Sequence, residues 1–247
     1  MDYANQVVVI TGGANGIGAA LAQAFSEKGA NVAVIDVDGR EKEHLQSGNV
    51  LFMQGDITEE SVLVEFANRI KERFKSVNYL INNACIGKGG ILSACSFEDF
   101  NYVLKLGVTA PYLLTSLLQD HFAAGASVLN ISSTRAAMSQ ADTEAYTAAK
   151  GGISALTHAL AISLSGKVRV NAISPGWIDT ELQSSHSEAD KAQHPAGRVG
   201  KVEDIVELAL FLGSPSAGFI TGENITVDGG MSRLMVYHGD KGWNYKV

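Results

Sequence analysis

Short apolar runs alternate along the chain with longer segments in which apolar residues recur at helical spacing. Two of the runs, Val7–Ile10 and Val32–Ile35, are apolar at every position, which is typical of strands buried on both faces of a parallel sheet. The pattern predicts strands over Gln6–Ile10, Asn31–Asp36, Val50–Gln54, Tyr79–Asn82, Ser127–Ser132, Val168–Ile173 and Ile225–Asp228. It predicts helices over Gly16–Lys28, Arg40–Gln46, Glu59–Phe74, Phe97–Phe122, Thr143–Ser165 and Val202–Leu212.

This alternation predicts an α/β fold of the Rossmann type, a doubly wound, seven-stranded parallel sheet with helices on both faces. The 247 residues contain no Ser- or Pro-rich linker, internal repeat or low-complexity tract, so we expect a single domain over residues 1–247. Two stretches fall outside the pattern, Ala84–Ser96 and Pro175–Val199, and each follows the carboxyl end of a predicted strand. Ligands bind at that edge of an open parallel sheet, so these stretches are candidate functional loops.

Composition narrows the classes of function. The chain has 19 basic and 26 acidic residues, a formal charge of −7 and no cluster of Lys or Arg, which argues against nucleic-acid or anionic-membrane binding. No apolar run is long enough to span a bilayer, and the opening Met1–Tyr3 has no basic region, so we expect a cytoplasmic protein without a signal peptide. The two cysteines, Cys85 and Cys95, lack the spacing of a zinc or redox site, and we expect no metal.

The first predicted strand ends in a glycine-rich turn with the sequence TGGANGIG. Glycines there permit positive φ angles and let the backbone approach a pyrophosphate closely, while the N-terminus of the following helix offers unpaired N–H groups. We therefore expect this turn to bind a dinucleotide, with contributions from Gly12, Asn15, Gly16, Ile17 and Gly18.

The second predicted strand ends at Asp36. A carboxylate at this place can accept hydrogen bonds from both hydroxyls of an adenosine ribose, and it would repel a 2′-phosphate. Positions 14 and 15 hold Ala and Asn, so the turn supplies no Lys or Arg to bind such a phosphate, and Asp38 adds negative charge. The sequence therefore predicts NAD rather than NADP as the cofactor.

Exchange of a hydride between an alcohol and a ketone needs a group that gives or takes a proton at the oxygen. Tyr146 and Lys150 are one helical turn apart, so the Lys cation can favour the phenolate of the Tyr and can also hydrogen-bond a cofactor ribose. Ser133, at the end of the fifth predicted strand, can hold the substrate oxygen beside Tyr146. These residues predict an oxidoreductase that acts on a small alcohol or ketone.

From Thr11 to Gly230 the ordered motifs resemble those of the short-chain dehydrogenase/reductase family. They are TGGANGIG, Gly55-Asp56-Ile57, Asn82-Asn83-Ala84, Asn130-Ile131-Ser132-Ser133, YTAAK, NAISPG and VDGG. The resemblance implies a lid over about residues 180–198 and a homodimer or homotetramer. It implies catalysis by Ser133, Tyr146 and Lys150, and cofactor contacts from Gly12, Asn15, Ile17, Asp36, Asp56, Ile57, Asn83, Pro175, Ile178 and Thr180.

The chain departs from the family pattern on the long predicted helix. Gly107 stands where many members carry a fourth catalytic residue, an Asn thought to hold a water through its backbone carbonyl. Pro111 has no N–H to bond the carbonyl four residues earlier. We hypothesise that Gly107 and Pro111 together leave that carbonyl available for the water. Cys85 stands where the family usually has another Gly.

Charged and aromatic side chains near the expected site carry further expectations. Arg135 stands where small residues are common, and we expect it to pair with Asp142 or Glu144, with a substrate carboxylate or phosphate as the alternative. His186 and His194 are expected on the surface of the lid. The tail over residues 231–247 is expected to pack on the domain or on a neighbouring subunit through its aromatic residues, Tyr237, Trp243 and Tyr245.

Three other functions remain open on the same fold. An NADP-dependent 3-oxoacyl-type carbonyl reductase is opposed by Asp36, and a catalytically weak nucleotide-sensing protein is opposed by the Tyr146–Lys150 pair. A lyase or dehalogenase is opposed by the intact glycine turn and by Lys150.

Overall fold

The strands form one seven-stranded sheet in the computed structural model, which describes residues 3–39, 49–181, 185–237 and 239–240. Their order is β3-β2-β1-β4-β5-β6-β9, and every pair of neighbours is parallel. The strands are β1 (Val7–Thr11), β2 (Asn31–Asp36), β3 (Val50–Gln54), β4 (Val77–Asn82), β5 (Phe122–Ile131), β6 (Val168–Pro175) and β9 (Asn224–Val227). The predicted parallel sheet is confirmed.

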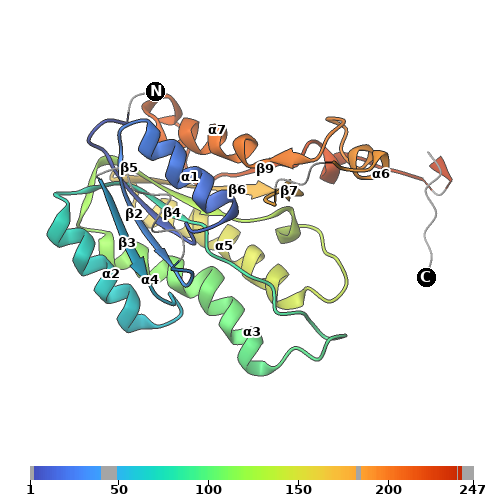
Figure 1. Ribbon diagram of the computed structural model, residues 1–247, viewed down its shortest axis with the longest axis horizontal. Helices are drawn as coiled ribbons and strands as arrows, with labels where there is room; N and C mark the ends of the chain where they lie inside the picture. Colours follow the sequence, from blue (N-terminus) through green and yellow to red (C-terminus); the bar gives the residue numbers. More distant parts are fainter. Residues whose placement is uncertain (1–2, 40–48, 182–184, 238, 241–247) are drawn as a thin grey trace.

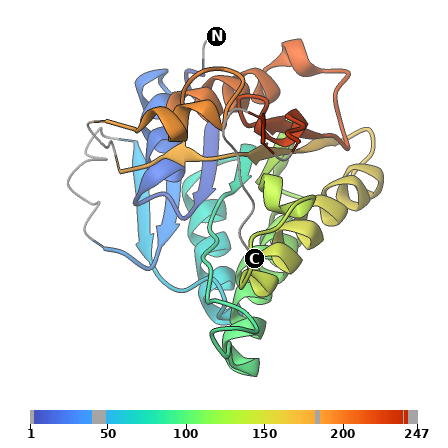
Figure 2. The ribbon, with the colours of Figure 1, turned by 90° about the vertical axis from the view of Figure 1, so that its right-hand side faces the viewer.

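Helices cover both faces of this sheet (Figure 1 and Figure 2). On one face α1 (Gly16–Glu27) packs beside α7 (Val202–Gly213). The other face is covered by α2 (Glu60–Arg73), α4 (Ala110–Leu118) and α5 (Glu144–Ser163). The short helix α3 (Phe97–Leu104) packs against α5. This arrangement confirms the doubly wound Rossmann-type fold.

Alternate residues of the central strands enter two different hydrophobic cores, because successive side chains point to opposite faces of a sheet. In β1, Val7 and Val9 belong to the core under α2, α4 and α5, whereas Val8 and Ile10 belong to the core under α1 and α7. All of these side chains are buried. The double burial explains why the strand sequences are apolar at every position rather than at every second one.

The direction of winding reverses beside β1. From β1 the chain adds β2 and β3 outward on one side, and it then crosses to place β4 on the other side of β1. In a doubly wound sheet this reversal opens a crevice at the carboxyl edge, between the loops that leave the two central strands. The glycine-rich turn after β1 and the stretch after β4 both emerge there.

The predicted helix Phe97–Phe122 is helical without interruption from residue 97 to residue 118, but it is not a regular α-helix throughout and it ends before Phe122. It consists of α3, a π-helical turn over Lys105–Thr109 and α4, and Phe122 begins β5. Pro111 accounts for the widened turn, because its ring clashes with the carbonyl of residue i−4 in a regular helix, which here is Gly107. The apolar pattern continues across the π-helical turn and therefore does not show it.

The stretch Pro175–Val199, which shows no periodicity, contains small regular elements. Strand β7 (Ile178–Asp179) pairs with β8 (Gly200–Lys201), and α6 (Glu188–Ala192) lies between them. Elements of two to five residues are too short for a periodic pattern to show. The predicted helix Arg40–Gln46 lies outside the described residues.

In the described part of the C-terminal tail, Met231, Leu234 and Val236 are half-buried and the other residues are exposed. Met235 and Tyr237 leave 75% and 68% of their surfaces open, so the expectation that Tyr237 packs on its own domain is wrong. Packing on a neighbouring subunit stays a prediction. Trp243 and Tyr245 lie outside the described residues.

Among the described residues, no helix is long and apolar enough to cross a membrane. Within the same residues, no three or more His, Cys, Asp and Glu side chains are grouped so that they could hold a metal ion. Cys85 and Cys95 are both free thiols and half-buried.

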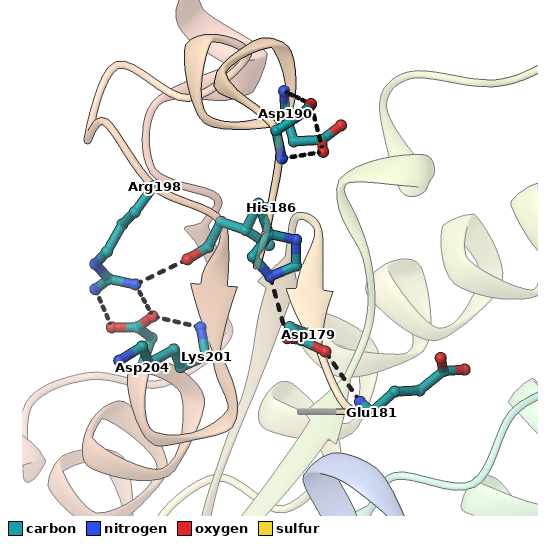
Figure 3. Close-up of polar contacts among 9 residues, drawn as sticks. Asp179, Glu181, His186, Asp190, Arg198, Lys201 and Asp204 are labelled. Carbon is teal, nitrogen blue, oxygen red and sulfur yellow. Dashed lines mark hydrogen bonds and ion pairs between the residues drawn. The ribbon is translucent and has the colours of Figure 1, made fainter. Parts of the chain in front are cut away.

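Charged contacts fix the start of α7 behind the small second sheet (Figure 3). Asp204 accepts hydrogen bonds from both terminal guanidinium nitrogens of Arg198, at 2.6 and 2.7 Å, and from the backbone N–H of Lys201 at 2.8 Å. Hydrogen bonding from the Arg198 guanidinium holds the pKa of Asp204 below its ordinary value. Asp204 therefore joins the stretch before β8 to the first turn of α7.

We expect Asp204→Asn to lower the free energy of unfolding at pH 7 by about 1 kcal/mol, and the Tm by roughly 2–4 °C, because the first turn of α7 loses a charged cap. The lowered pKa makes this stabilisation present above the unfolded-state value near pH 4 and lost as the pH falls through the folded-state value. Thermal unfolding of both proteins from pH 7 to pH 3 measures the difference, which should close at the acid end. Glu203→Gln removes the same charge from the exposed neighbouring residue and should change the Tm less. A gap that stays constant down to pH 3 would contradict this account.

Candidate active site

A cavity of about 430 Å³ opens at the carboxyl edge of the sheet, where the winding reverses. Most of the site residues predicted from the sequence line this cavity, including residues of the glycine-rich turn and the three catalytic candidates. These are Gly12, Asn15, Ile17, Asp36, Ile57, Asn83, Ser133, Tyr146, Lys150, Pro175, Ile178 and Thr180. Three others, Gly16, Gly18 and Asp56, are not in its lining.

The glycine-rich turn is folded tightly against the end of β4. Gly12 has a φ of +68°, and a Cβ atom there would come within 2.8 Å of the Ala84 backbone. A Cβ on Gly18 would lie 1.9 Å from the Gly12 carbonyl oxygen, so Gly18 serves the packing of α1 against the turn rather than the lining of the cavity. Larger residues at these two positions would push the turn away from Ala84 and from the start of α1.

The first turn of α1 fits a bound pyrophosphate. Asn15 is the N-cap residue, and within the described residues its side chain makes no capping bond to the helix. The first turn contains no acidic residue. The N-terminal N–H groups and the positive end of the helix dipole therefore face the cavity beside Gly12, which is the arrangement that binds phosphate groups.

Asp36 lies in the cavity wall at the same end. One of its carboxylate oxygens accepts the Ala14 N–H at 2.9 Å, and the other accepts the Asp38 N–H at 2.9 Å. Each oxygen has a second lone pair, so Asp36 can still accept hydrogen bonds from ribose hydroxyls. These backbone bonds fix the carboxylate in place beside the glycine-rich turn.

Asn83 joins two strand ends. Its side-chain amide donates to the carbonyls of Gly12, at 2.7 Å, and Thr11, at 3.2 Å. The preceding residue, Asn82, donates to the side chain of Asn130 on β5 at 2.8 Å. Both Asn side chains therefore tie neighbouring strand ends together. Asn83 thus shapes the turn in addition to lining the cavity.

Lys150 is buried and lies beside Tyr146 at the other end of the cavity. Its ammonium nitrogen donates to the Ile131 carbonyl at 2.7 Å and lies 5.4 Å from the centre of the Tyr146 ring. The Ser132 hydroxyl donates to the Lys150 carbonyl at 3.0 Å, so both ends of Lys150 are fixed to the end of β5. The helical spacing of Tyr146 and Lys150 does bring their side chains together.

Ser133 follows β5 and is half-buried in the cavity wall. Its hydroxyl oxygen accepts the backbone N–H of Arg135 at 3.2 Å. No residue in the described part of the chain accepts the Ser133 O–H, so this group is available to donate to a substrate oxygen. Ser133 and Tyr146 therefore face one space.

The expected pairing of Arg135 with an acid is wrong. Its guanidinium instead donates to the side-chain oxygen of Gln140 and lies 5.5 Å from the centre of the Tyr146 ring. Asp142 accepts the backbone N–H groups of Leu92 and Ser93, and contacts with Ser93 hold the pKa of Asp142 below its usual range. Glu144 accepts the N–H of Ile91 in the same way. The sequence could not show that the carboxylates of Asp142 and Glu144 accept backbone N–H groups of the loop after β4.

The two histidines of the stretch after β7 are not surface residues. His194 is 3% exposed, its Nδ1–H donates to the Asp190 carbonyl at 3.0 Å, and its buried Nε2 has no partner among the described residues. His186 is half-buried and contacts the Asp179 carboxylate at 3.1 Å (Figure 3). Trp177 packs against both rings, and this apolar contact is what draws them inward.

Two residues of the cavity wall, Tyr102 and Leu106, carry no recognised signal in the sequence, whereas Cys85, which also lines it, is a departure from the family pattern. The Tyr102 hydroxyl donates to the Asp56 side chain at 3.0 Å and holds this carboxylate behind the cavity wall. Tyr102 lies just before the π-helical turn and Leu106 lies within it, so a regular helical period does not give the direction of their side chains.

Gly107, on the π-helical turn, is buried against α5. A Cβ atom at this position would lie 2.9 Å from the Ala149 Cβ and 3.3 Å from the Cys85 sulfur. Only glycine therefore allows the turn to approach α5 next to Lys150 at this distance. The hypothesis that the Gly107 carbonyl holds a water stays a prediction.

Comparisons with known proteins show which proteins the chain is similar to. A family model described as enoyl-(acyl carrier protein) reductase matches residues 12–232. An uncharacterized oxidoreductase of Thermotoga maritima is 39% identical over 250 residues, covering 94% of this chain and 98% of that protein. The L-fucose dehydrogenase of Mus musculus is 38% identical over 245 residues, covering 92% and 89%. A solved apo SCOR enzyme from Clostridium thermocellum has a TM-score of 0.91 and 43% identity, covering 98% and 99%.

We expect Gly107→Ala to destabilise the protein by about 1–3 kcal/mol, because the added methyl group overlaps Ala149. Ala149→Gly alone should cost about 1 kcal/mol through helix propensity, whereas the double variant should be more stable than the sum of the single effects predicts. Denaturant unfolding of the four proteins measures this coupling. Additive effects within about 0.3 kcal/mol would show that the two residues do not contact each other in this way.

Proposed function

The chain belongs to the short-chain dehydrogenase/reductase family of oxidoreductases, and we propose that it is an NAD-dependent enzyme that transfers a hydride between nicotinamide and an alcohol or ketone. Enzymes of this family bind a nicotinamide cofactor and act on CH–OH groups. The observation that carries the finer proposal is that one cavity runs from Asp36 and the glycine-rich turn to Ser133, Tyr146 and Lys150.

The wall of this cavity fits a dinucleotide along its length. The uncapped first turn of α1 and Gly12 would hold the pyrophosphate, and Asp36 would hold the adenosine ribose. Lys150 would hydrogen-bond the second ribose, and Pro175, Ile178 and Thr180 would lie beside the nicotinamide. When bound, the nicotinamide accepts or supplies the hydride.

Asp36 supports NAD rather than NADP. Its carboxylate is held by two backbone N–H groups in a position where a 2′-phosphate would meet negative charge. Asp38 lies next to it and contacts the Asn15 side chain at 3.4 Å, so the second carboxylate also faces this end of the site.

Tyr146 is the proposed acid and base. In the oxidation of an alcohol its phenolate takes the proton of the hydroxyl, and in the reduction of a ketone its hydroxyl returns a proton to the oxygen. The ammonium group of Lys150 stabilises the phenolate by charge, and Ser133 donates to the substrate oxygen so that it stays within reach of Tyr146. The bond from Lys150 to Ile131 keeps this cation in place.

The broader assignments belong to the same proposal. We propose a single catalytic domain over residues 1–247, with a substrate lid over about residues 180–198, that works in the cytoplasm as a homodimer or homotetramer. An NADP-dependent 3-oxoacyl-type reductase is the alternative enzyme, and a nucleotide-sensing protein is the alternative without catalysis. A preference for NADP would distinguish the 3-oxoacyl-type reductase from the proposed enzyme. The effect of Tyr146→Phe on turnover would distinguish the sensing protein from it.

We expect NAD at 100-fold excess over its Kd to stabilise the protein by about 2.7 kcal/mol and to raise the Tm by roughly 5–10 °C, with a smaller shift for NADP at the same concentration. Asp36→Ala should weaken NAD binding and reduce the preference about tenfold or more, because the ribose loses its acceptor and the 2′-phosphate loses a repelling charge. Thermal unfolding and calorimetric titration measure both effects. A larger shift with NADP for the wild-type protein would favour the 3-oxoacyl-type reductase.

Tyr146→Phe should reduce the rate of NADH formation about 100-fold or more while leaving the Kd for NAD nearly unchanged, because only proton transfer is lost. Absorbance of NADH, followed over a panel of secondary alcohols, sugars and hydroxy acids, measures the rate. Tyr112→Phe removes the same hydroxyl from an exposed side chain of α4 that does not line the cavity, and it is the matched control. If the wild-type protein binds NAD but oxidises nothing in the panel, and Tyr146→Phe changes nothing, the sensing function replaces the catalytic one.

A further inference from the structure

We propose that Arg135 binds an anionic group of the substrate, a carboxylate or a phosphate, next to Tyr146. This inference rests on the proposed function and names its substrate class: alcohols or ketones that also carry a carboxylate or phosphate. It is carried by the placement of Arg135, by the absence of an acidic partner for it and by the charges around the catalytic end of the cavity.

Arg135 is joined to the proposed catalytic residues through both its backbone and its side chain. Its backbone N–H donates to the Ser133 hydroxyl oxygen at 3.2 Å, and its guanidinium carbon lies 5.5 Å from the centre of the Tyr146 ring. A substrate oxygen held between Ser133 and Tyr146 would therefore place the neighbouring atoms of a small molecule close to the guanidinium.

Within the part of the chain that the structure describes, the Arg135 guanidinium has no acidic partner. Across residues 3–39, 49–181, 185–237 and 239–240, no ion pair includes Arg135, and its side chain donates to one neutral acceptor, the Gln140 amide oxygen. Guanidinium groups carry several N–H donors, and those not used by Gln140 can bind an anion. The acids nearest in sequence are occupied elsewhere, because Asp142 and Glu144 accept backbone N–H groups of the loop after β4.

The charges along the cavity also favour an anion at this end. Of the described residues that line the cavity, Asp36 and Lys150 are the charged ones, and Asp36 is at the opposite end beside Ala14. Lys150 is buried against the Ile131 carbonyl. Arg135 is not among the lining residues, but its guanidinium lies beside the ring of Tyr146, which is one of them. The catalytic end therefore has one cation in its wall, Lys150, a second cation next to that wall and no carboxylate in the described wall, and an anionic substrate would supply the missing charge.

The contacts of Arg135 orient it for this role. An Arg that stacks on an aromatic ring loses little further freedom when it binds, and its planar group matches carboxylate and phosphate oxygens in pairs. The Tyr146 ring and Gln140 hold the guanidinium from two directions. A purely structural role, in which Arg135 only positions the Tyr146 ring, would affect charged and neutral substrates equally.

The test uses the full-length protein saturated with NAD, titrated with ketones, which cannot react with the oxidised cofactor. Three pairs of ketones without hydroxyl groups each compare an anion with its neutral methyl ester: acetoacetate and methyl acetoacetate, 4-oxopentanoate and its methyl ester, and 2-oxopropyl phosphate and its dimethyl ester. We expect at least one anion to bind about tenfold or more tightly than its neutral counterpart, with the difference decreasing as salt is added. Whether the preferred anion is a carboxylate or the phosphate identifies the group.

Arg135→Gln should remove this difference while leaving the Kd for NAD and the binding of neutral ketones nearly unchanged, and Arg135→Lys should retain part of it. Arg69→Gln removes the same charge from an exposed side chain of α2 that does not line the cavity, and it is the matched control. The proposal is overturned if no anion binds more tightly than its neutral partner, or if Arg135→Gln binds anions as the wild-type protein does. Failure of NAD itself to bind would instead overturn the proposed function, and this inference with it.

Discussion

Burial of both faces of the parallel sheet is the constraint on which the rest of this structure depends. Because Val7 and Val9 enter one core and Val8 and Ile10 enter the other, polar side chains can gather only at the strand ends. All strands are parallel, so their carboxyl ends share one edge. The glycine-rich turn, Asp36, Asn83 and Ser133 each follow a different strand and nevertheless line one cavity.

Within that frame, a small number of buried hydrogen bonds fixes α5 relative to β5. Ser132 donates to the Lys150 carbonyl, and the Lys150 ammonium group donates to the Ile131 carbonyl. Further along α5, the Thr157 hydroxyl accepts a hydrogen bond from the side-chain amide of Asn130 on β5 at 2.9 Å. Buried polar groups are costly when unpaired, so these bonds admit few alternative alignments of helix and strand. Tyr146 and Ser133 consequently face each other from two separate elements.

Two departures from the family pattern have different physical meanings. Gly107 removes a side chain where the π-helical turn approaches Ala149, and it thereby allows the close packing of that turn beside Lys150. Arg135 adds a cation beside Tyr146, while the nearby acids hold the loop after β4 instead of neutralising it. One departure concerns the backbone that surrounds the site, and the other concerns the molecules that the site can accept.

The sequence by itself determined the sheet, most of the helices and the residues that line the two ends of the cavity, because apolar periodicity, glycine positions and the Tyr146–Lys150 spacing are local properties. Contacts between distant segments were decided only by the tertiary structure. Three features depend on tertiary contacts: the partners of Arg135, the inward packing of His194 against Trp177, and the π-helical turn at Gly107 beside α5. Local spacing carries no information about such contacts, since they follow from how the whole chain packs.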